Sequence, residues 1–398
     1  MKNFILISPH FPHTYYHFAE ALKNNGFRVL GIGDCSWEEL DPNLRRNLDE
    51  WYACYNMDDI NNELKAVQYF VEKYRQIDYL ESNNEYWLEK DAHLREWFNI
   101  PNGVRTNELI YWQHKSKMKE LYKKAGARIA DYTLVENKEQ LLIFIKKVGY
   151  PVFIKPDIGM GAAGDYKIKN EEDVDFFFKD RNKNITYICE QFVTGNIVSF
   201  DGICDDNSDV VFSDSNLFPP SVADIVKENG DLFYYTAKEV PEDLKEIGSK
   251  VIKAFNVKKR FFHLEFFRLT KDVKGVGKIN DLVALETNMR PPGGYTPDLI
   301  NFSQSTNCYQ IYADIMAFNE NKQDLTIKKY YAACASRRDF VCYKHTDQEV
   351  FDKYHDKLCN YGHYPYVLSG AMGNKYLMAK FDTIEEVNEF QEYVEARN

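Results

Sequence analysis

The feature that most constrains this sequence is a set of alternating polar residues at the end of an apolar strand. Leu282–Leu285 is apolar, and Glu286, Asn288 and Arg290 follow at every second position. Residues spaced in this way project from one face of a strand. Carboxylate and amide oxygens are ligands that suit Mg²⁺, and a neighbouring arginine can hold a phosphoryl oxygen or a carboxylate. The pattern therefore predicts a metal and anion site at a strand end, followed by a Pro-Pro-Gly-Gly break.

A second strand, His263–Leu269, carries a carboxylate of its own at Glu265. If this strand pairs with Leu282–Thr287, Glu265 and Glu286 can lie side by side. Two carboxylates at such a short distance repel each other unless a cation lies between them. The alternative is a pair of solvated carboxylates, which is the usual state of an isolated glutamate. The spacing of the whole set favours a metal site.

Lys155 ends the apolar strand Tyr150–Lys155, and Pro156 keeps it extended. A lysine among apolar neighbours on a half-buried strand needs an anionic partner. That partner is a phosphate or the carboxylate of an ordinary salt bridge.

The next segment, with Gly159, Gly161 and Gly164, spells G-x-G-x-x-G. A dinucleotide-binding motif of this form should follow a first strand and open a helix. Here it lies in mid-chain and precedes an alternating, strand-like stretch, which disfavours NAD. A glycine flap with main-chain N–H groups over phosphates fits better, and a plain glycine turn is the simpler alternative.

Composition excludes several other classes. The 398 residues predict two or three domains. A net charge of -11 without a dense Lys/Arg run argues against nucleic acid. The eight cysteines form no C-x-x-C pair, which argues against zinc or dithiol redox chemistry. No apolar run approaches the roughly 18 residues of a membrane span, and the N-terminus lacks a signal peptide pattern, so we expect a cytoplasmic protein without a membrane partner.

In this order, these pieces resemble the ATP-grasp superfamily. The resemblance is closest to its carboxylate–amine ligases, which are the L-amino acid ligases and the relatives of carbamoyl-phosphate synthetase and biotin carboxylase. It covers about residues 1–325, and the ordered set of motifs between Lys115 and Gly294 carries it.

The resemblance implies an α/β fold in three parts. An open parallel α/β domain spans 1–112, and the strand–helix–strand pattern of the first 33 residues agrees with it. An ATP-grasp domain with antiparallel sheets spans 113–325, with a lid subdomain at about 128–193. A small α+β region spans 326–398.

The resemblance also implies a role for each matched position. Lys115, with Lys117 as a competitor, matches the first phosphate-binding lysine, and Lys155 matches the second. The three glycines match the phosphate lid. The remaining matches are the adenine hinge at Glu190, Gln191, Phe192 and Val193, the magnesium ligands Glu265, Glu286 and Asn288, and the catalytic Arg290. Many relatives carry a ribose-binding acid where Ile197 stands here, so Asp201, the nearest acid, is the expected ribose contact.

The implied reaction joins a small-molecule carboxylate to an amine. ATP and Mg²⁺ (or Mn²⁺) are the expected cofactors, and an acyl phosphate is the expected intermediate, with release of ADP and phosphate. Amino acids are candidate substrates, and His10, His13, Glu85 and Tyr295 are candidates for their pocket. The tail is expected to complete the acceptor site or to mediate a homodimer.

Three other functions are weighed against this one. The first is an ATP-grasp enzyme with a different nucleophile, such as a carboxylase or a carbamoyl-phosphate-type enzyme. A biotin carboxylase often carries a biotinylated Met-Lys-Met segment, which does not occur in this sequence. A nucleotide-binding pseudoenzyme is disfavoured because the metal and phosphate positions are all present. An NAD-dependent oxidoreductase is disfavoured by the place of its glycine motif.

Overall fold

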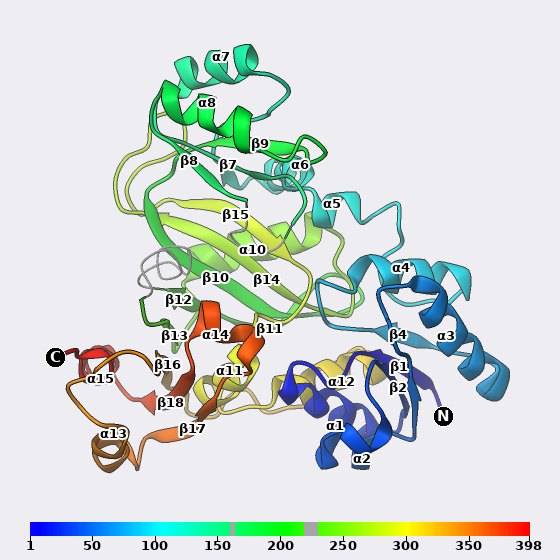
Figure 1. Ribbon diagram of the computed structural model, residues 1–398. Helices are drawn as coiled ribbons and strands as arrows, with labels where there is room; N and C mark the ends of the chain where they lie inside the picture. The colour runs from blue at the N-terminus through cyan, green and yellow to red at the C-terminus, as the bar shows by residue number, and fades with distance from the viewer. Residues whose placement is uncertain (160–163, 219–229) are drawn as a thin grey trace.

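The computed structural model describes residues 1–159, 164–218 and 230–398, and these form three sheets. Figure 1 shows the first sheet at the lower right, a small sheet under α7 and α8 at the top, and a long central sheet between them. None of the helices in the described residues is long and apolar enough to cross a membrane.

The first sheet is parallel, with strand order β3-β2-β1-β4. Successive side chains of β1 point to opposite faces, so Phe4 and Leu6 pack with α1 and α12, whereas Ile5 and Ile7 pack with α3 and α4. This confirms the predicted open parallel α/β unit. Its elements are β1 (Asn3–Ile7), α1 (Tyr16–Asn24), β2 (Arg28–Gly33), α2 (Pro42–Asn47), β3 (Glu50–Ala53), α3 (Ile60–Tyr74), β4 (Tyr79–Glu81) and α4 (Leu88–Trp97).

The small sheet is antiparallel, with strand order β6-β9-β7-β8. Asn137 and Asn170 cap the two helices that cover it, because each side chain accepts a hydrogen bond from the first turn of its helix. The apolar faces of these helices pack on Val152, Ile154 and their neighbours. Its elements are β6 (Tyr132–Leu134), α7 (Lys138–Val148), β7 (Val152–Pro156), β8 (Tyr166–Ile168), α8 (Glu171–Asp180) and β9 (Tyr187–Gln191).

The central sheet runs β17-β18-β16-β13-β12-β10-β14-β15-β5 in the described residues, with β11 paired to β10. Its long middle strands, β10 (Gly195–Cys204), β14 (Arg260–Leu269) and β15 (Leu282–Asn288), are antiparallel. The other strands are β5 (Arg128–Ile129), β11 (Val210–Asp214), β12 (Asn216–Phe218), β13 (Phe233–Thr236), β16 (Tyr331–Arg337), β17 (Leu358–His363) and β18 (Lys375–Phe381).

Helices α6 and α10 pack together against this sheet. The tail adds strands to the same sheet, since β16 pairs with β13. Two of the tail helices, α13 and α15, begin with capping boxes at Thr346 and Thr383. The domain limits at 112 and 325 stay predictions. The remaining helices are α5 (Ile110–Gln113), α6 (Lys115–Ala125), α10 (Glu242–Ala254), α11 (Thr296–Gln304), α12 (Cys308–Phe318), α13 (Asp347–Tyr354), α14 (Tyr366–Met372) and α15 (Ile384–Glu395).

Candidate active site

The two glutamates predicted to be neighbours are cross-strand partners. In the β14–β15 register Glu265 is opposite Glu286, and His263 is opposite Asn288. The side chains of both glutamates are 25% exposed, so each carboxylate reaches the surface from a largely buried strand. Two carboxylates and one amide oxygen therefore gather at the end of this strand pair.

His263 keeps Glu265 ionised. Its Nε2 lies 3.3 Å from Glu265 Oε1, and its Nδ1 contacts Asp201. Burial would lower the pKa of His263, but the carboxylates of Asp201 and Glu265 raise it to about 9. Burial would in turn raise the pKa of Glu265, but His263, together with the charges of Arg290 and Lys155, more than offsets this, so that the pKa is lowered. Glu265 is a carboxylate at neutral pH and is available to a cation.

The placement of Asp201 does not fit the ribose contact expected of it. Its side chain is fully buried between β10 and β14. Besides His263, it accepts hydrogen bonds from Ser199 and, at 2.7 Å, from Asn216 Nδ2. Asp201 lies directly opposite His263 in the β10–β14 pairing, and its carboxylate orients that imidazole ring.

The structure distinguishes the two candidate lysines of α6. Lys115 is 6% exposed, and its Nζ donates to the Gly159 carbonyl at 2.8 Å and lies 3.4 Å from Glu286 Oε1. Lys117 points outward and pairs with Glu120 one turn away. Lys115 is therefore the lysine that joins the paired glutamates.

Asp157, just after β7, fixes the start of α6 and so places Lys115. Its carboxylate accepts hydrogen bonds from Ser116 N at 2.7 Å and Ser116 Oγ at 2.9 Å, and it contacts His114 Nδ1 at 2.9 Å. Its main-chain oxygen accepts from Lys115 N. The α6 N-terminus is thus tied to the loop that leads into the glycine segment.

Lys155 and Glu190 form a buried ion pair, with Lys155 Nζ 2.6 Å from Glu190 Oε2. Lys119, which the sequence analysis missed, lies one turn after Lys115 and pairs with the other oxygen of Glu190. Burial would raise the pKa of Glu190, but the two lysines lower it to about 2. Burial also opposes the charge of Lys155, yet Glu190 and Glu286 raise its pKa. Lys155 therefore keeps its positive charge next to Glu286.

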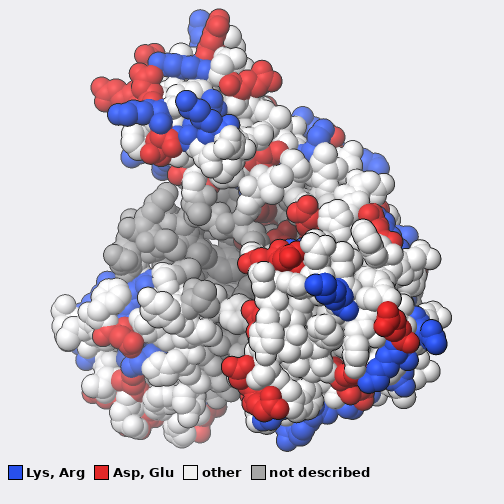
Figure 2. Space-filling model, turned by 45° about the vertical axis from the view of Figure 1, so that its right-hand side comes forward, with Lys and Arg blue, Asp and Glu red and all other residues white. Residues whose placement is uncertain are grey.

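The glycine segment and the hinge lie at the edges of this cluster. Gly159 and Gly164 have φ values of 148° and 83°, a region that favours glycine, and Gly161 lies outside the described residues. The hinge residues Gln191, Phe192 and Val193 join β9 of the small sheet to β10 of the central sheet. Figure 2 shows the surface hollowed between the small-sheet lobe and the rest of the molecule, with acidic side chains at its rim.

Arg290 follows β15 and lies beside the first sheet. Its Nη1 donates to the Pro291 carbonyl at 2.8 Å, and its Nε is 4.0 Å from Glu85 Oε2. Burial raises the pKa of Glu85, and Arg290 acts against that rise.

The other pocket candidates are placed differently. His10 pairs with Asp34 at 2.9 Å, and His13 is exposed. Tyr295 is buried against Tyr364 and Tyr376. Of the four candidates, Glu85 is the one that a contact places beside Arg290.

Sequence comparison finds relatives for part of the chain. Residues 114–193, from just before Lys115 to the end of the hinge, match the family described as "Carbamoyl-phosphate synthase L chain, ATP binding domain". The L-arginine-specific L-amino acid ligase of Bacillus subtilis is 23% identical over 234 residues, which is 56% of each chain. The phosphoribosylamine–glycine ligase of Clostridium acetobutylicum is 31% identical over 108 residues, covering 25% of this chain and 26% of that protein.

Comparison with solved structures decides the fold. The L-amino acid ligase of Bacillus licheniformis superposes with a TM-score of 0.71 at 14% identity, covering 98% of this chain and 96% of that one. The chain has the fold of the ATP-grasp enzymes. The biotin carboxylase domain of the Hydrogenobacter thermophilus 2-oxoglutarate carboxylase, solved with MgADP, ADP and bicarbonate, also gives 0.71, at 16% identity and with 100% and 90% coverage. The predicted fold class is confirmed.

The residues gathered at this site fit a magnesium nucleotide. The described residues contain no group of three or more His, Cys, Asp or Glu placed to hold a metal alone. Glu265, Glu286 and Asn288 supply two carboxylates and an amide, and Mg²⁺ is commonly bound by one or two carboxylates together with substrate phosphates. Lys115 and Lys155 add the positive charge that phosphates require. The residues that would hold the metal and those that would bind the phosphates thus lie in one region, where Lys115 Nζ is 3.4 Å from Glu286 Oε1.

Proposed function

We propose that this chain is an ATP-dependent carboxylate–amine ligase that forms an amide or peptide bond. The observation that carries the proposal is the pairing of Glu265 with Glu286, with Asn288 and Arg290 next along the same strand end and Lys115 at 3.4 Å. This arrangement offers hard metal ligands, a phosphate-binding lysine and an anion-binding arginine within one short region. The L-amino acid ligases among its relatives support the choice of an amine as the nucleophile.

When bound, Mg-ATP supplies the phosphoryl group that converts a carboxylate into an acyl phosphate, which an amine then attacks with release of ADP and phosphate. Phosphoryl transfer needs positioning and charge neutralisation more than covalent help. Glu265, Glu286 and Asn288 would hold the metal. Lys115 and Lys155 would bind phosphate oxygens, and the buried Glu190 keeps Lys155 in place.

Arg290 is suited to the carboxylate end of the reaction. Its guanidinium can hold the substrate carboxylate and then stabilise the oxyanion that forms when the amine attacks. The glycine segment that starts at Gly159 would exclude water, to which an acyl phosphate is sensitive. Glu85, close to Arg290, is an acidic group that could face the amino group of an amino acid substrate.

The test is release of ADP and phosphate from Mg-ATP in the presence of amino acids, singly and in pairs. L-Arginine belongs in the panel because one relative is named for it, and bicarbonate tests the carboxylase alternative. We expect release that requires two amino acids, with a product whose mass equals their sum less one water. Release with bicarbonate alone would identify a carboxylase. ATP binding without release in any mixture would identify a nucleotide-binding protein without ligase chemistry.

A further inference from the structure

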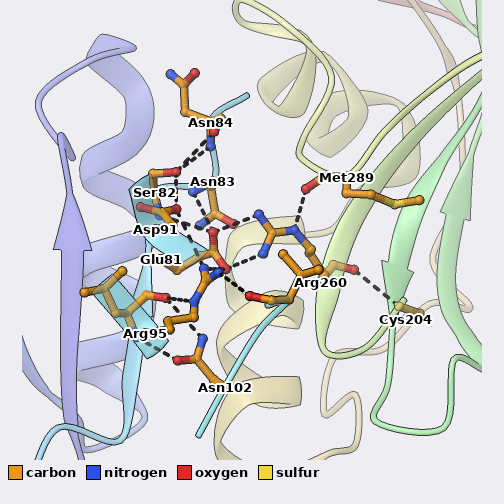
Figure 3. A network of polar contacts seen from close by, with 12 residues as sticks. Glu81, Ser82, Asn83, Asn84, Asp91, Arg95, Asn102, Cys204, Arg260 and Met289 are labelled. Atoms are coloured by element: carbon orange, nitrogen blue, oxygen red, sulfur yellow. Dashed lines mark hydrogen bonds and ion pairs between the residues drawn. The ribbon is translucent and has the colours of Figure 1, made fainter. Parts of the chain in front are cut away.

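A buried cluster of charges links the first sheet to the end of β15 (Figure 3). Arg260, the first residue of β14, is 2% exposed, and its guanidinium lies between two segments far apart in the sequence. On one side Nη1 and Nη2 bind the two oxygens of Glu81, the Nη2 bond measuring 2.8 Å. On the other side Nε donates to the main-chain oxygen of Met289.

Glu81 ends β4 and is shared by two arginines. Arg95 Nη2 donates to its Oε2 at 2.9 Å, while Arg95 Nε donates to the Leu80 carbonyl at 3.0 Å. Asp91 lies 3.7 Å from Arg95 and accepts from Ser82, so the cluster holds two guanidinium and two carboxyl groups. Both arginines are buried and both bind Glu81, and of the two Arg260 is the one hydrogen-bonded to Met289.

Met289 lies between Asn288 and Arg290, two of the predicted site residues. The paired residues of β15 end at Asn288, opposite His263, so the Met289 carbonyl lies beyond the β14–β15 ladder. Because the peptide unit is planar, holding this oxygen fixes the plane that leads into Arg290. The residue before Met289 is Asn288, the proposed metal ligand. One hydrogen bond therefore acts on the path of the chain between the amide ligand and the arginine.

We propose that Arg260 is a positioning residue for the reaction, setting the Asn288–Arg290 segment against the first sheet through Glu81. The inference rests on the proposed function for the roles of Asn288 and Arg290. A second contact supports it, because Glu85, four residues after Glu81, lies 4.0 Å from Arg290 Nε. The segment 81–85 is thus linked to the segment 288–290 at two points, through the buried Arg260 side chain and through the Glu85–Arg290 contact.

The variant Arg260→Lys isolates this role. A lysine keeps the charge but cannot make the two-pronged contact with Glu81 and also donate from a third nitrogen to Met289. Glu81 retains Arg95, so the change leaves no unpaired buried carboxylate. Arg95→Lys is the matched control, because it makes the same chemical change to the same carboxylate without touching Met289.

The probe is ATP at a fixed concentration with Mg²⁺ titrated, read as nucleotide-dependent stabilisation against heat. In Arg260→Lys we expect the Mg²⁺ concentration for half-maximal stabilisation to rise about ten- to a hundredfold, the range for a residue that orients a metal ligand. In Arg95→Lys it should stay within about threefold, although the fold may lose stability. A shift below threefold in Arg260→Lys, or equal shifts in both variants, would overturn the proposal.

If Arg260→Lys does not fold, Glu81→Gln replaces it. This change keeps the side-chain length and leaves Arg260 Nε able to donate to Met289, but it removes the charge that fixes the guanidinium. A rise in the Mg²⁺ requirement supports the proposal, and an unchanged requirement contradicts it. The two proposals fail separately, because wild-type protein that binds Mg-ATP without ligation refutes the ligase while the Mg²⁺ comparison still judges Arg260.

Discussion

Glu286 is the direct cross-strand partner of Glu265, and it is also 3.4 Å from the Lys115 ammonium. One carboxylate thus connects the paired glutamates of the central sheet, which we propose as metal ligands, to the first lysine of α6. Since Lys115 in turn donates to the Gly159 carbonyl, the contact continues to the glycine segment. The contacts of Glu286 and Lys115 thus join residues from three separate parts of the chain.

Replacing Glu286 with glutamine should weaken magnesium-dependent ATP binding. The amide keeps the size of the side chain but removes one of the two negative charges facing the cation. We expect the affinity for Mg-ATP to fall on the order of tenfold to a hundredfold, measured by isothermal titration calorimetry. Glu246→Gln on the exposed face of α10 is the control and should bind as the wild type does. Equal affinities for both variants would remove Glu286 from the metal site.

Lys115 and Lys117 provide a matched pair on one helix. Lys115→Met removes a buried charge near Glu286, whereas Lys117→Met removes an exposed one paired with Glu120. A hydrogen bond to a charged group contributes about 1.5–3 kcal/mol, so ATP affinity should fall roughly ten- to a hundredfold in the first variant. The second should change it by less than about twofold. A larger effect at Lys117 would reverse the assignment.

Arg290→Ala should separate binding from turnover. Loss of one preorganised donor typically costs about 10²–10³ in rate, so product formation should fall by that factor while Mg-ATP binding persists. Coupled ADP assays and calorimetry on the same preparation measure both quantities. Arg128→Ala, which removes an exposed arginine paired with Asp281, serves as the control. Unchanged turnover in Arg290→Ala would exclude a role for this arginine in the reaction.

Glu63 makes stability depend on pH. It is fully buried on α3, neither carboxyl oxygen has a hydrogen-bond partner in the described residues, and burial raises its pKa to about 8. The folded state therefore holds a proton that the unfolded chain releases above about pH 4.3. Folded protein binds more protons, so this group lowers the free energy of unfolding as pH rises towards 8, on the order of a few kcal/mol.

Glu63→Gln removes that titration. In urea unfolding, the variant should match wild type at about pH 5 and exceed its stability at about pH 8. Glu89→Gln, on the exposed face of α4, should track the wild type at both values. A variant that is no more stable than wild type at pH 8 would show that ionisation of Glu63 does not lower the free energy of unfolding.

The local pattern predicted much of the site. The alternation along two apolar strands predicted that Glu265 and Glu286 can lie side by side. Once the two strands pair, the pleat determines which side chains share a face of the sheet. Parallel strands in the first 80 residues followed from the strand–helix–strand order. These successes rest on interactions between neighbours in sequence or between adjacent strands.

The misses depend on long-range contacts. Lys119 resembles any other lysine on a polar helix, and its partner Glu190 is 71 residues away on β9. Asp201 was predicted as the ribose contact because it is the acid nearest to Ile197, but the register of β10 against β14 places it opposite His263. Nothing near Arg260 in the sequence indicates Glu81, 179 residues earlier. The α+β content of the tail was predicted, but its place in the central sheet was not, because β16 pairs with β13, which lies about a hundred residues upstream.

The most direct test of the central claim follows the oxygen atoms. Amino acids labelled with ¹⁸O in their carboxyl groups are incubated with the protein and Mg-ATP, and the released phosphate is analysed by mass spectrometry. If the carboxylate attacks the γ-phosphorus and the amine then displaces phosphate, each phosphate released must carry one heavy oxygen from the carboxyl group. Phosphate without the label would show that water, not a carboxylate, attacks ATP, and would contradict the assignment of this site to carboxylate activation.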